Sequence, residues 1–299
     1  MARDFFLTSV AMTEKITEVS TVLLPIIKIS EDGKMYTSDS IAVEEPLEIR
    51  IEYGPATGRK IKNVSVTMRT PGNDFELATG FLFTEGIIKR AEDIIAIEYV
   101  FMLCSEDKEN ILLVKLQEDV VLDLQTIDRN FYTSSSCGVC GKASIEAITT
   151  TISRVVSDDT IEITSSFLQS LPRILRDNQK IFETTGGLHA SAIFDTEGQI
   201  LIAREDVGRH NALDKLIGAA LPLDMLPLNT SVLMLSGRMS FELIQKAAMA
   251  GLQLVVAIGA PSSLAIELAK EFDITLVGFL RREQFNIYSG EHRVKDNVI

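Results

Sequence analysis

The sequence predicts an α/β protein with a smaller N-terminal α+β lobe and a larger C-terminal lobe. From residue 190 onward, short apolar runs typical of buried strands alternate with helical segments. This alternation is typical of an open sheet covered by helices on both faces. In the first third of the chain, short β-rich runs alternate with turns around a single helix. A chain of 299 residues that is 46% hydrophobic can bury cores of this size.

The N-terminal elements follow from the alternation of apolar runs and turns. Strands are expected at residues 21–30, 41–53, 60–70, 94–103 and 110–116. A helix is expected within residues 70–88. We expect Asn73 to cap this helix, Glu76 to complete a capping box three residues later, and Gly86 to end the helix.

The C-terminal elements begin with a hairpin, in which residues 190–194 and 199–205 flank a four-residue turn. Helices and strands then alternate to the end of the chain. Helices are expected at 210–221, 240–252 and 262–272, and strands at 231–235, 254–259, 274–280 and 285–289. Between the two halves, a polar and irregular stretch at 123–136 marks a boundary. We therefore divide the chain into an extension at 1–40, an N-terminal α+β lobe at 41–135 and a C-terminal lobe at 136–299.

Composition excludes several classes of partner. The net charge of −13 argues against DNA or RNA, which require a broad basic surface. The first 20 residues lack the apolar core of a signal peptide, and the early apolar run at 21–27 is too short to span a bilayer. Three cysteines fit a reducing compartment better than a disulfide framework. The sequence therefore predicts a cytoplasmic protein with no membrane and no nucleic-acid partner.

Two of the three cysteines, Cys137 and Cys140, form a Cys-x-x-Cys motif in the run SSSCGVCG. A helix is expected directly after it, at 142–155, so the thiol of Cys137 lies near a helix start that favours the thiolate. Such a thiolate can carry sulfur as a persulfide or exchange disulfides. A pair of structural thiols and a zinc site are the other two interpretations.

The zinc interpretation lacks the remaining ligands. A structural zinc site takes four ligands, and the residues left to complete it are Cys104, His189, His210 and His292, none of them in a second paired motif. A zinc deaminase would need a His-x-Glu motif and a proline before the first cysteine, and the sequence has neither. We predict no metal site.

Polar residues gather where the C-terminal strands are expected to end, which is where open α/β sheets bind ligands. The candidates are His189 after a Gly-Gly pair, Arg209 and His210 before a helix, and Arg238 in the turn after strand 231–235. Helix starts with Ser, Gly and Arg can hold phosphates. The alternative is that residues such as Asn211 only cap their helices.

The combination of motifs resembles one family. In this order, CGVCG, TGGLHASA, REDVGRHNALDKLIG, SGRMSFELIQKAAMAG and TLVGFLR are similar to the formate dehydrogenase accessory sulfurtransferase (FdhD) family, as is RTPGNDFELATGFLFTEGII upstream. The resemblance covers residues 44–288. It implies a cytidine-deaminase-like three-layer α/β/α fold in the C-terminal lobe, without the zinc of the deaminases, and a homodimer.

The resemblance also implies a function. A cysteine desulfurase would donate sulfur to a persulfide on the protein. The acceptor would be the molybdenum cofactor of formate dehydrogenase, a bis(molybdopterin guanine dinucleotide), before its insertion; GDP would mimic the nucleotide part. Two alternatives stay open: a non-catalytic chaperone that binds the cofactor, and a thiol–disulfide oxidoreductase.

The resemblance assigns residues by motif. Cys137 corresponds to the persulfide-bearing cysteine and Cys140 to its partner. The segment that contacts the cofactor follows the TLVGF strand and comprises Phe279, Leu280, Arg281, Arg282, Glu283 and Gln284. The roles of His189, Arg209 and His210, and that of Arg238, rest on their positions and chemistry instead.

Overall fold

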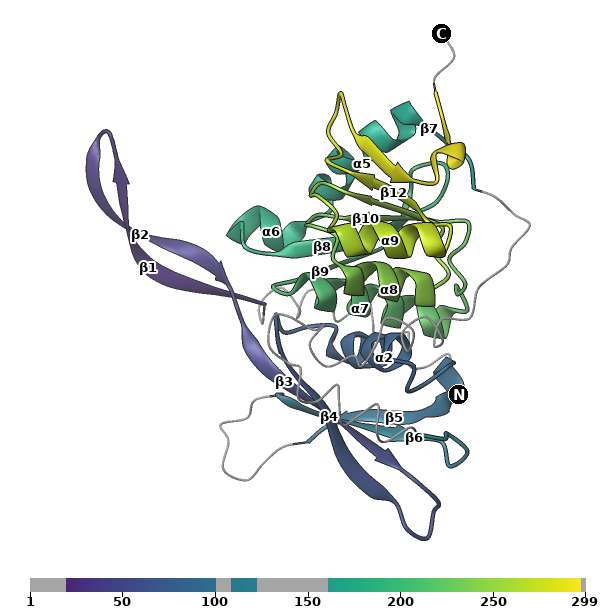
Figure 1. Ribbon diagram of the computed structural model, residues 1–299. Helices are drawn as coiled ribbons and strands as arrows, with labels where there is room; N and C mark the ends of the chain where they lie inside the picture. The colour runs from purple at the N-terminus through teal and green to yellow at the C-terminus, as the bar shows by residue number, and fades with distance from the viewer. Residues whose placement is uncertain (1–19, 101–108, 123–160, 297–299) are drawn as a thin grey trace.

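The computed structural model describes residues 20–100, 109–122 and 161–296. Within these ranges the chain forms three parts: a two-stranded arm at 21–42, an N-terminal lobe at 43–122 and a C-terminal lobe at 161–296 (Figure 1). The predicted α/β class is confirmed. Residues 123–160 lie outside the described ranges, so the predicted boundary between 135 and 136 stays a prediction.

The N-terminal lobe is a four-stranded sheet with one helix on its inner face. The strand order is β4-β3-β6-β5, and only the β3–β6 pair is parallel. The elements are β3 (Glu45–Tyr53), β4 (Lys60–Arg69), α2 (Asp74–Thr84), β5 (Ile94–Tyr99) and β6 (Ile111–Leu116). Alternate residues of β3 (Leu47, Ile49 and Ile51) are buried against α2, which explains the period of two in this run.

The start of α2 differs from the prediction, whereas its end agrees with it. Asn73 occupies the N-cap position, but its backbone is left-handed (φ 58°) and its side chain makes no capping bond. Glu76 pairs with Arg204 of the C-terminal lobe, so the predicted capping box is wrong. A tertiary ion pair has replaced the local bond. Gly86, at φ 72°, ends the helical segment as expected.

The C-terminal lobe is built on a six-stranded mixed sheet in the order β13-β12-β11-β10-β8-β9. The three central strands β10, β11 and β12 are parallel, and the other three strands pair antiparallel. The strands are β8 (His189–Phe194), β9 (Ile200–Asp206), β10 (Val232–Leu235), β11 (Leu254–Ala257), β12 (Thr275–Gly278) and β13 (Asn286–Ser289). The predicted hairpin is the β8–β9 pair.

Helices cover both faces of this sheet. Leu233 and Leu235 of β10 pack in the core beneath the helices α7, α8 and α9, whereas Val232 and Met234 pack on the other face, with α5. The helices are α5 (Ser165–Asp177), α6 (Lys180–Thr185), α7 (Arg209–Ala220), α8 (Phe241–Met249) and α9 (Ser263–Glu271). The two faces explain why the central strands are continuously apolar. The likeness to cytidine deaminases stays a prediction.

Two expectations about helices fail. The predicted elements include no helix between 161 and 188, where α5 and α6 lie, although Leu168, Leu171 and Leu175 have helical spacing and are fully buried. Asn211 does not cap α7, because that helix begins at Arg209 after the N-cap Gly208.

Two short strands, β7 (Ile163–Thr164) and β14 (Val294–Lys295), form a separate parallel pair.

The two lobes meet through a very close contact between α2 and α7, which lie one above the other in Figure 1. Gly80 of α2 and Gly218 of α7 face the opposite helix, and a Cβ on either glycine would overlap a backbone carbonyl of the other helix. Beside this contact the buried Nζ of Lys246, on α8, pairs with Asp214 at 2.9 Å and donates across the interface to the hydroxyl of Thr84, on α2, at 2.8 Å. The lobes therefore join by backbone packing and by buried charge.

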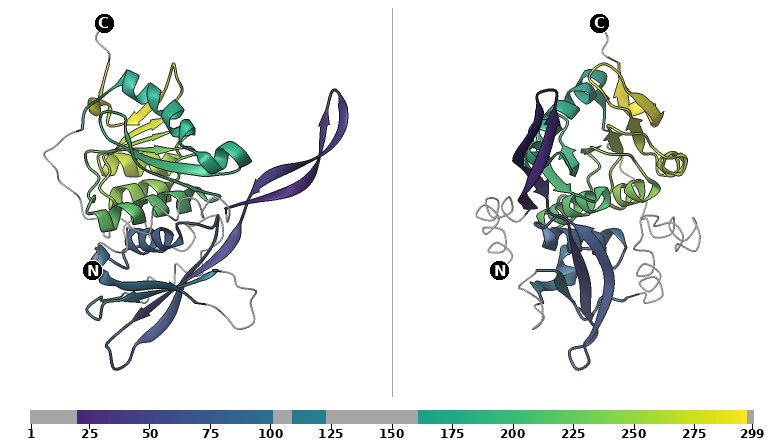
Figure 2. Two further views of the ribbon diagram at one scale, coloured as in Figure 1. Left: turned by 180° about the vertical axis from the view of Figure 1, so that it is seen from behind. Right: turned by 90° about the vertical axis from the view of Figure 1, so that its left-hand side faces the viewer.

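The arm projects away from both lobes, as Figure 1 and the left view of Figure 2 show. It consists of β1 (Thr21–Ser30) and β2 (Gly33–Ala42), which form an antiparallel hairpin. Much of its apolar surface is open: Leu23, Ile29 and Tyr36 are 69%, 71% and 74% exposed.

Among the described helices, none is long and apolar enough to cross a membrane.

Candidate functional site

The candidate site lies along the edge of the six-stranded sheet where β10, β11 and β12 end. Because β8 runs antiparallel to β10, its first residue, His189, lies at the same edge, opposite Asp206 at the end of β9. Arg209 and His210 open α7, and Arg238 lies in the turn between β10 and α8. The topology thus brings four sequence-predicted residues to one edge.

Glycines allow the turns at this edge to approach one another closely. A Cβ on Gly237 would lie 3.1 Å from the Nδ1 of His189 and 3.9 Å from the Cδ of Arg209, so this glycine stands between the two side chains. A Cβ on Gly259 would lie 2.6 Å from the carbonyl oxygen of Gly237. The two glycines therefore let these turns pack directly against each other and against His189, which a side chain at either position would prevent.

His189 is a neutral group in a cationic environment. Partial burial lowers its pKa, and the positive charges of Arg209 and Arg238 lower that pKa further, while Asp206 acts in the opposite direction. A neutral imidazole donates one hydrogen bond and accepts one. His189 can therefore bind a polar ligand while the two arginines supply positive charge.

His210 is also neutral at physiological pH. Burial, followed by the charges of Arg209 and Lys246, lowers its pKa to about 4. Its Nε2 lies 3.0 Å from the Oγ of Ser240, and Glu242 is 3.9 Å away. His210 therefore joins the start of α7 to the start of α8 and has one hydrogen-bonding position already taken.

Arg209 has unused hydrogen-bonding capacity. Its Nε is buried and has no hydrogen-bond partner within the described part of the chain. A buried donor without an acceptor is uncommon and destabilising. An anionic ligand at this edge would supply the acceptor, and a guanidinium is well suited to bind phosphate oxygens.

The segment after β12 lies further along the same edge. Phe279 has a left-handed backbone (φ 53°) and is 43% exposed, whereas the side chain of Leu280 is fully buried in the core. Arg281 is exposed, and its Nη1 donates to the Ile258 carbonyl in the turn after β11 at 2.9 Å. The next three side chains, those of Arg282, Glu283 and Gln284, are exposed.

The two groups of predicted residues form the ends of one long site. Three strand spacings separate β8 from β12, so His189 and the segment after β12 are about 14 Å apart along the edge. A phosphate alone would not reach both ends. A dinucleotide-sized ligand would do so.

Three neighbouring polar residues at the end of β9 make contacts within the protein. Arg204 pairs with Glu76, the Glu205 carboxylate accepts hydrogen bonds from the backbone of α6, and Asp206 is completely buried. The sequence places these residues at a strand end, but it contains no signal that separates them from ligand-binding residues. Their partners lie in other elements and are visible only in the fold.

The cysteines Cys104, Cys137 and Cys140 all lie outside the described residues, so the predictions about the Cys-x-x-Cys motif stay predictions. Among the residues that are described, no group of three or more His, Cys, Asp or Glu side chains is placed to hold a metal ion. The sheet edge is therefore the part of the predicted site that the structure describes.

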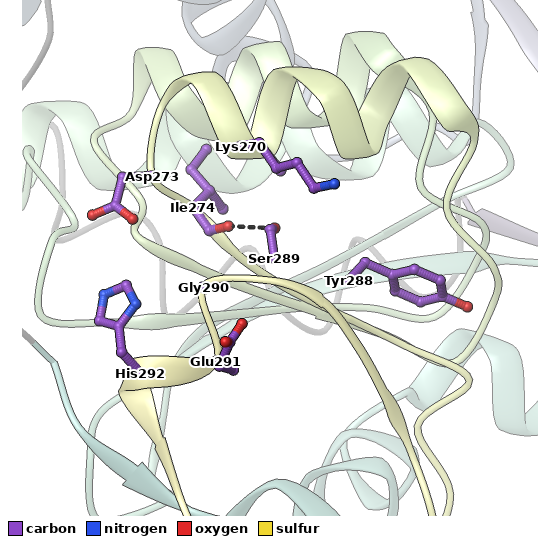
Figure 3. Close-up of a pocket in the computed structure, with 9 residues that line it drawn as sticks. Lys270, Asp273, Ile274, Tyr288, Ser289, Gly290, Glu291 and His292 are labelled. Atoms are coloured by element: carbon purple, nitrogen blue, oxygen red, sulfur yellow. Dashed lines mark hydrogen bonds between the residues drawn. The ribbon is translucent and has the colours of Figure 1, made fainter.

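The candidate site does not coincide with the pocket drawn in Figure 3. That pocket, of about 450 Å³, lies beside the start of β12, at the opposite edge of the sheet. It is lined by Lys270, Asp273, Glu291 and His292, and one of its walls is held by a hydrogen bond from Ser289 to the Ile274 carbonyl. Of the residues considered above as ligands, it contains only His292, which was weighed for the zinc interpretation, and none of the residues predicted to bind the cofactor.

Comparisons with known proteins agree with one another. The model of the FdhD/NarQ family matches residues 42–295. The sulfur carrier protein FdhD of Mycolicibacterium paratuberculosis is 50% identical over 259 residues, which are 86% of this chain and 92% of the relative. The protein of the same description from Streptomyces avermitilis is 47% identical over 273 residues, 90% of this chain and 94% of the relative.

A solved structure shares the fold. It is that of a candidate formate dehydrogenase accessory protein from Desulfotalea psychrophila, with a TM-score of 0.68 over 92% of this chain and 99% of that chain. The two sequences are 22% identical, so this likeness concerns the fold alone.

Proposed function

The chain belongs to the FdhD/NarQ family, as its motifs predict, and from this premise we propose that it is a cytoplasmic sulfur carrier that serves formate dehydrogenase. Cys137 accepts sulfur from a cysteine desulfurase. The sulfur then passes to the molybdenum cofactor, which is the substrate of the protein. The observation that best supports an acceptor site is the buried Nε of Arg209 at the cationic sheet edge, which has no hydrogen-bond partner among the described residues.

The loading step conserves atoms and charge. The Cys137 thiolate attacks the terminal sulfur of a persulfide on the desulfurase. A new S–S bond to Cys137 forms, the S–S bond of the donor breaks, and the donor cysteine leaves as a thiolate. The position of Cys137 just before a predicted helix favours the thiolate that this step requires.

The delivery step requires two electrons. The terminal sulfur of the persulfide is formally zero-valent, and it becomes a sulfido ligand when a Mo(IV) centre supplies two electrons and becomes Mo(VI). The S–S bond breaks and Cys137 leaves as a thiolate. The molybdenum substrate is thus both the acceptor and the reductant.

The sheet edge fits the nucleotide end of this substrate. A bis(molybdopterin guanine dinucleotide) carries pyrophosphate groups, whose oxygens match the guanidinium of Arg209 and the imidazole of His189. Arg238 adds positive charge at this end, and His210 joins the two helix starts. At the far end, Phe279 offers an exposed ring, with Arg281, Arg282, Glu283 and Gln284 beside it, while Leu280 anchors the segment in the core.

Mass spectrometry tests the carrier role. After incubation with a cysteine desulfurase and cysteine, the wild type gains one reducible sulfur at Cys137, and Cys137→Ala neither gains it nor restores formate dehydrogenase activity in a deletion strain. Cys104→Ala is the matched control and loads normally. Full restoration by Cys137→Ala would contradict the proposal, and so would a Cys137 that does not load.

The alternatives predict different results. A non-catalytic chaperone would bind GDP, as a mimic of the cofactor, without any desulfurase-dependent persulfide. A thiol–disulfide oxidoreductase would turn over disulfide substrates through a Cys137–Cys140 disulfide. Loading of Cys140→Ala at the wild-type level would leave Cys137 as the sole carrier.

We also propose that two copies of the chain form a homodimer through their arms. Leu24 and Ile26 lie on one face of the hairpin and Leu23 and Ile27 on the other, so both faces offer apolar surface. Two ten-residue strands make a ribbon about 34 Å long.

A second copy suits this surface because the hairpin is complementary to itself. Within the described part of the chain the arm is a sheet of two strands only, so two arms related by a two-fold axis can pair along a strand or pack face to face. Light scattering of the full chain is expected to give a dimer, and Leu23→Asp with Ile27→Asp a monomer. A variant that stays dimeric, or a monomeric wild type, would contradict this assignment.

A further inference from the structure

We propose that Asp206 is a positioning residue for the sheet edge: its buried carboxylate holds the turn that presents Arg209 and joins that turn to the N-terminal lobe. The inference rests on the proposed function, because Arg209 is the group to which we assign anion binding. Asp206 itself, with 0% of its surface exposed, is out of reach of any ligand.

One oxygen of this carboxylate organises the turn. The Oδ1 of Asp206 accepts a hydrogen bond from the backbone N–H of Gly208 at 2.8 Å and another from the side-chain amide of Asn211 at 3.1 Å. Gly208 immediately precedes Arg209. The carboxylate thus fixes the backbone on one side of Arg209 through Gly208 and on the other through Asn211.

The other oxygen reaches the N-terminal lobe. The Oδ2 of Asp206 accepts from the backbone N–H of Thr70 at 3.1 Å and from the Nζ of Lys215 at 2.7 Å. Lys215 is 1% exposed and also donates to the carbonyl of Thr70 at 2.8 Å. Thr70, the residue directly after β4, is therefore hydrogen-bonded to Asp206 through its N–H and to Lys215 through its carbonyl.

Asn211 completes the link between the lobes. Its amide donates to the carbonyl of Met68 at 2.8 Å, and its oxygen accepts from the hydroxyl of Thr67 at 3.2 Å. The space around this amide is tight, since a Cβ on Gly208 would lie 3.0 Å from it. The end of β4 and the start of α7 are therefore held in one arrangement.

The location of Asp206 separates this role from general stabilisation of the lobe interface. Asp206 lies opposite His189 in the β8–β9 register, so its charge acts on both His189 and the turn before Arg209. The Arg204–Glu76 pair, two residues earlier on β9, also joins the lobes, but no hydrogen bond connects its side chains to the turn. Glu76 is therefore a matched control.

Calorimetric titration of the full chain with GDP tests the inference. Each carboxylate oxygen of Asp206 accepts from two donors. Asp206→Asn replaces one of these oxygens with an NH2 group, which cannot accept, so either Thr70 and Lys215 or Gly208 and Asn211 must lose their bonds to this side chain. We expect the GDP dissociation constant to rise about tenfold at a temperature where the variant is folded. Arg209→Gln should weaken binding to a similar extent, and Glu76→Gln should leave the dissociation constant unchanged.

A second variant and a second measurement keep the inference falsifiable. If Asp206→Asn does not fold, Asn211→Ala, which keeps the Asp206–Lys215 pair, should weaken GDP binding by about threefold. Wild-type affinity in a folded Asp206→Asn protein, or equal weakening by Glu76→Gln, would overturn the positioning role.

Failure of the proposed function gives a different result. If the wild type binds no GDP, the acceptor site is wrong, and the NMR signal of the Arg209 Nε–H then decides the positioning role without any ligand. Faster solvent exchange of this proton in Asp206→Asn, but not in Glu76→Gln, supports it. Unchanged exchange in both variants contradicts it.

Discussion

Two regions of the molecule, the arm and the interface between the two lobes, depart in opposite directions from the usual distribution of side chains. At the interface, charged groups such as Lys246, Asp214 and Lys215 are buried. On the arm, large apolar groups such as Leu23 and Ile29 are exposed. Each arrangement is unfavourable for an isolated side chain, because a buried charge loses hydration and an exposed apolar group orders water.

The two regions differ in where their partners lie. Each of these interface charges is paired with an opposite charge from another element of the same chain, and a polar oxygen adds a further bond. Lys246, for example, pairs with Asp214 and donates to the Thr84 hydroxyl. The apolar groups of the arm remain exposed within the described residues. The interface is therefore complete in a single chain, whereas the arm is suited to a partner.

The largest effect is expected when a charge of the interface loses its partner. Lys246→Met leaves Asp214 buried without its cation and should lower the free energy of unfolding by about 3–5 kcal/mol, measured by urea at pH 7. The exposed Lys270→Met is the control, with a change of less than about 0.5 kcal/mol. A loss below about 1 kcal/mol for Lys246→Met would mean that the pair contributes little.

The same variant should respond to pH with a defined sign. Burial raises the pKa of Asp214, and removal of Lys246 takes away the charge that opposes this rise. A folded-state pKa above the unfolded value near 3.9 means that protonation stabilises the folded form. The stability of Lys246→Met relative to wild type should therefore increase as the pH falls from 7 towards 4, and a further decrease would contradict this account.

The next effect concerns the contact between α2 and α7. Gly80→Ala places a Cβ against the Asp214 carbonyl and should cost about 1–3 kcal/mol, although alanine alone favours a helix by about 1 kcal/mol. Gly58→Ala, which has nothing within 4 Å of the added carbon, is the control. Thermal unfolding of both variants measures the difference, and a stabilised Gly80→Ala would show that the helices can separate.

A smaller effect is expected from the partly exposed ion pair of the interface. Glu76→Gln removes the charge that Arg204 contacts with two nitrogens, and both side chains remain about a quarter exposed. Exposed pairs contribute less than about 1 kcal/mol. If urea unfolding shows that Glu76→Gln lowers the free energy of unfolding as much as Lys246→Met does, then burial does not determine how much a charge contributes at this interface.

The smallest effect is expected on the arm. Ile29→Thr should change the free energy of unfolding by less than about 0.5 kcal/mol at protein concentrations where the chain is monomeric, because this side chain is already 71% exposed. Leu47→Thr, on the buried face of β3, is the matched control and should be clearly destabilised. Equal losses in both variants would place the arm within the folded core.

Local pattern was sufficient to predict most of the C-terminal lobe. The strands at 231–235, 254–259 and 274–280 are correct to within two residues at each end, because buried strands are apolar throughout and turns interrupt them. The positions of His189, Arg209, His210 and Arg238 at one edge also followed from the sequence. Each is adjacent to a strand or helix end, and parallel strands end at a common edge.

The sequence by itself therefore determined the order of most elements, α5 and α6 excepted, together with the α/β class and the family. Burial of one face of a helix or strand produces a repeat of apolar residues that can be recognised within a few positions. Only the tertiary structure decided which polar residues pair with other parts of the protein and which remain candidates for ligand binding at the sheet edge. Glu76 pairs with Arg204 and Asp206 with Thr70, more than a hundred residues away in each case. Neither partner leaves a trace in the local pattern, because a hydrogen bond depends on which elements meet in space.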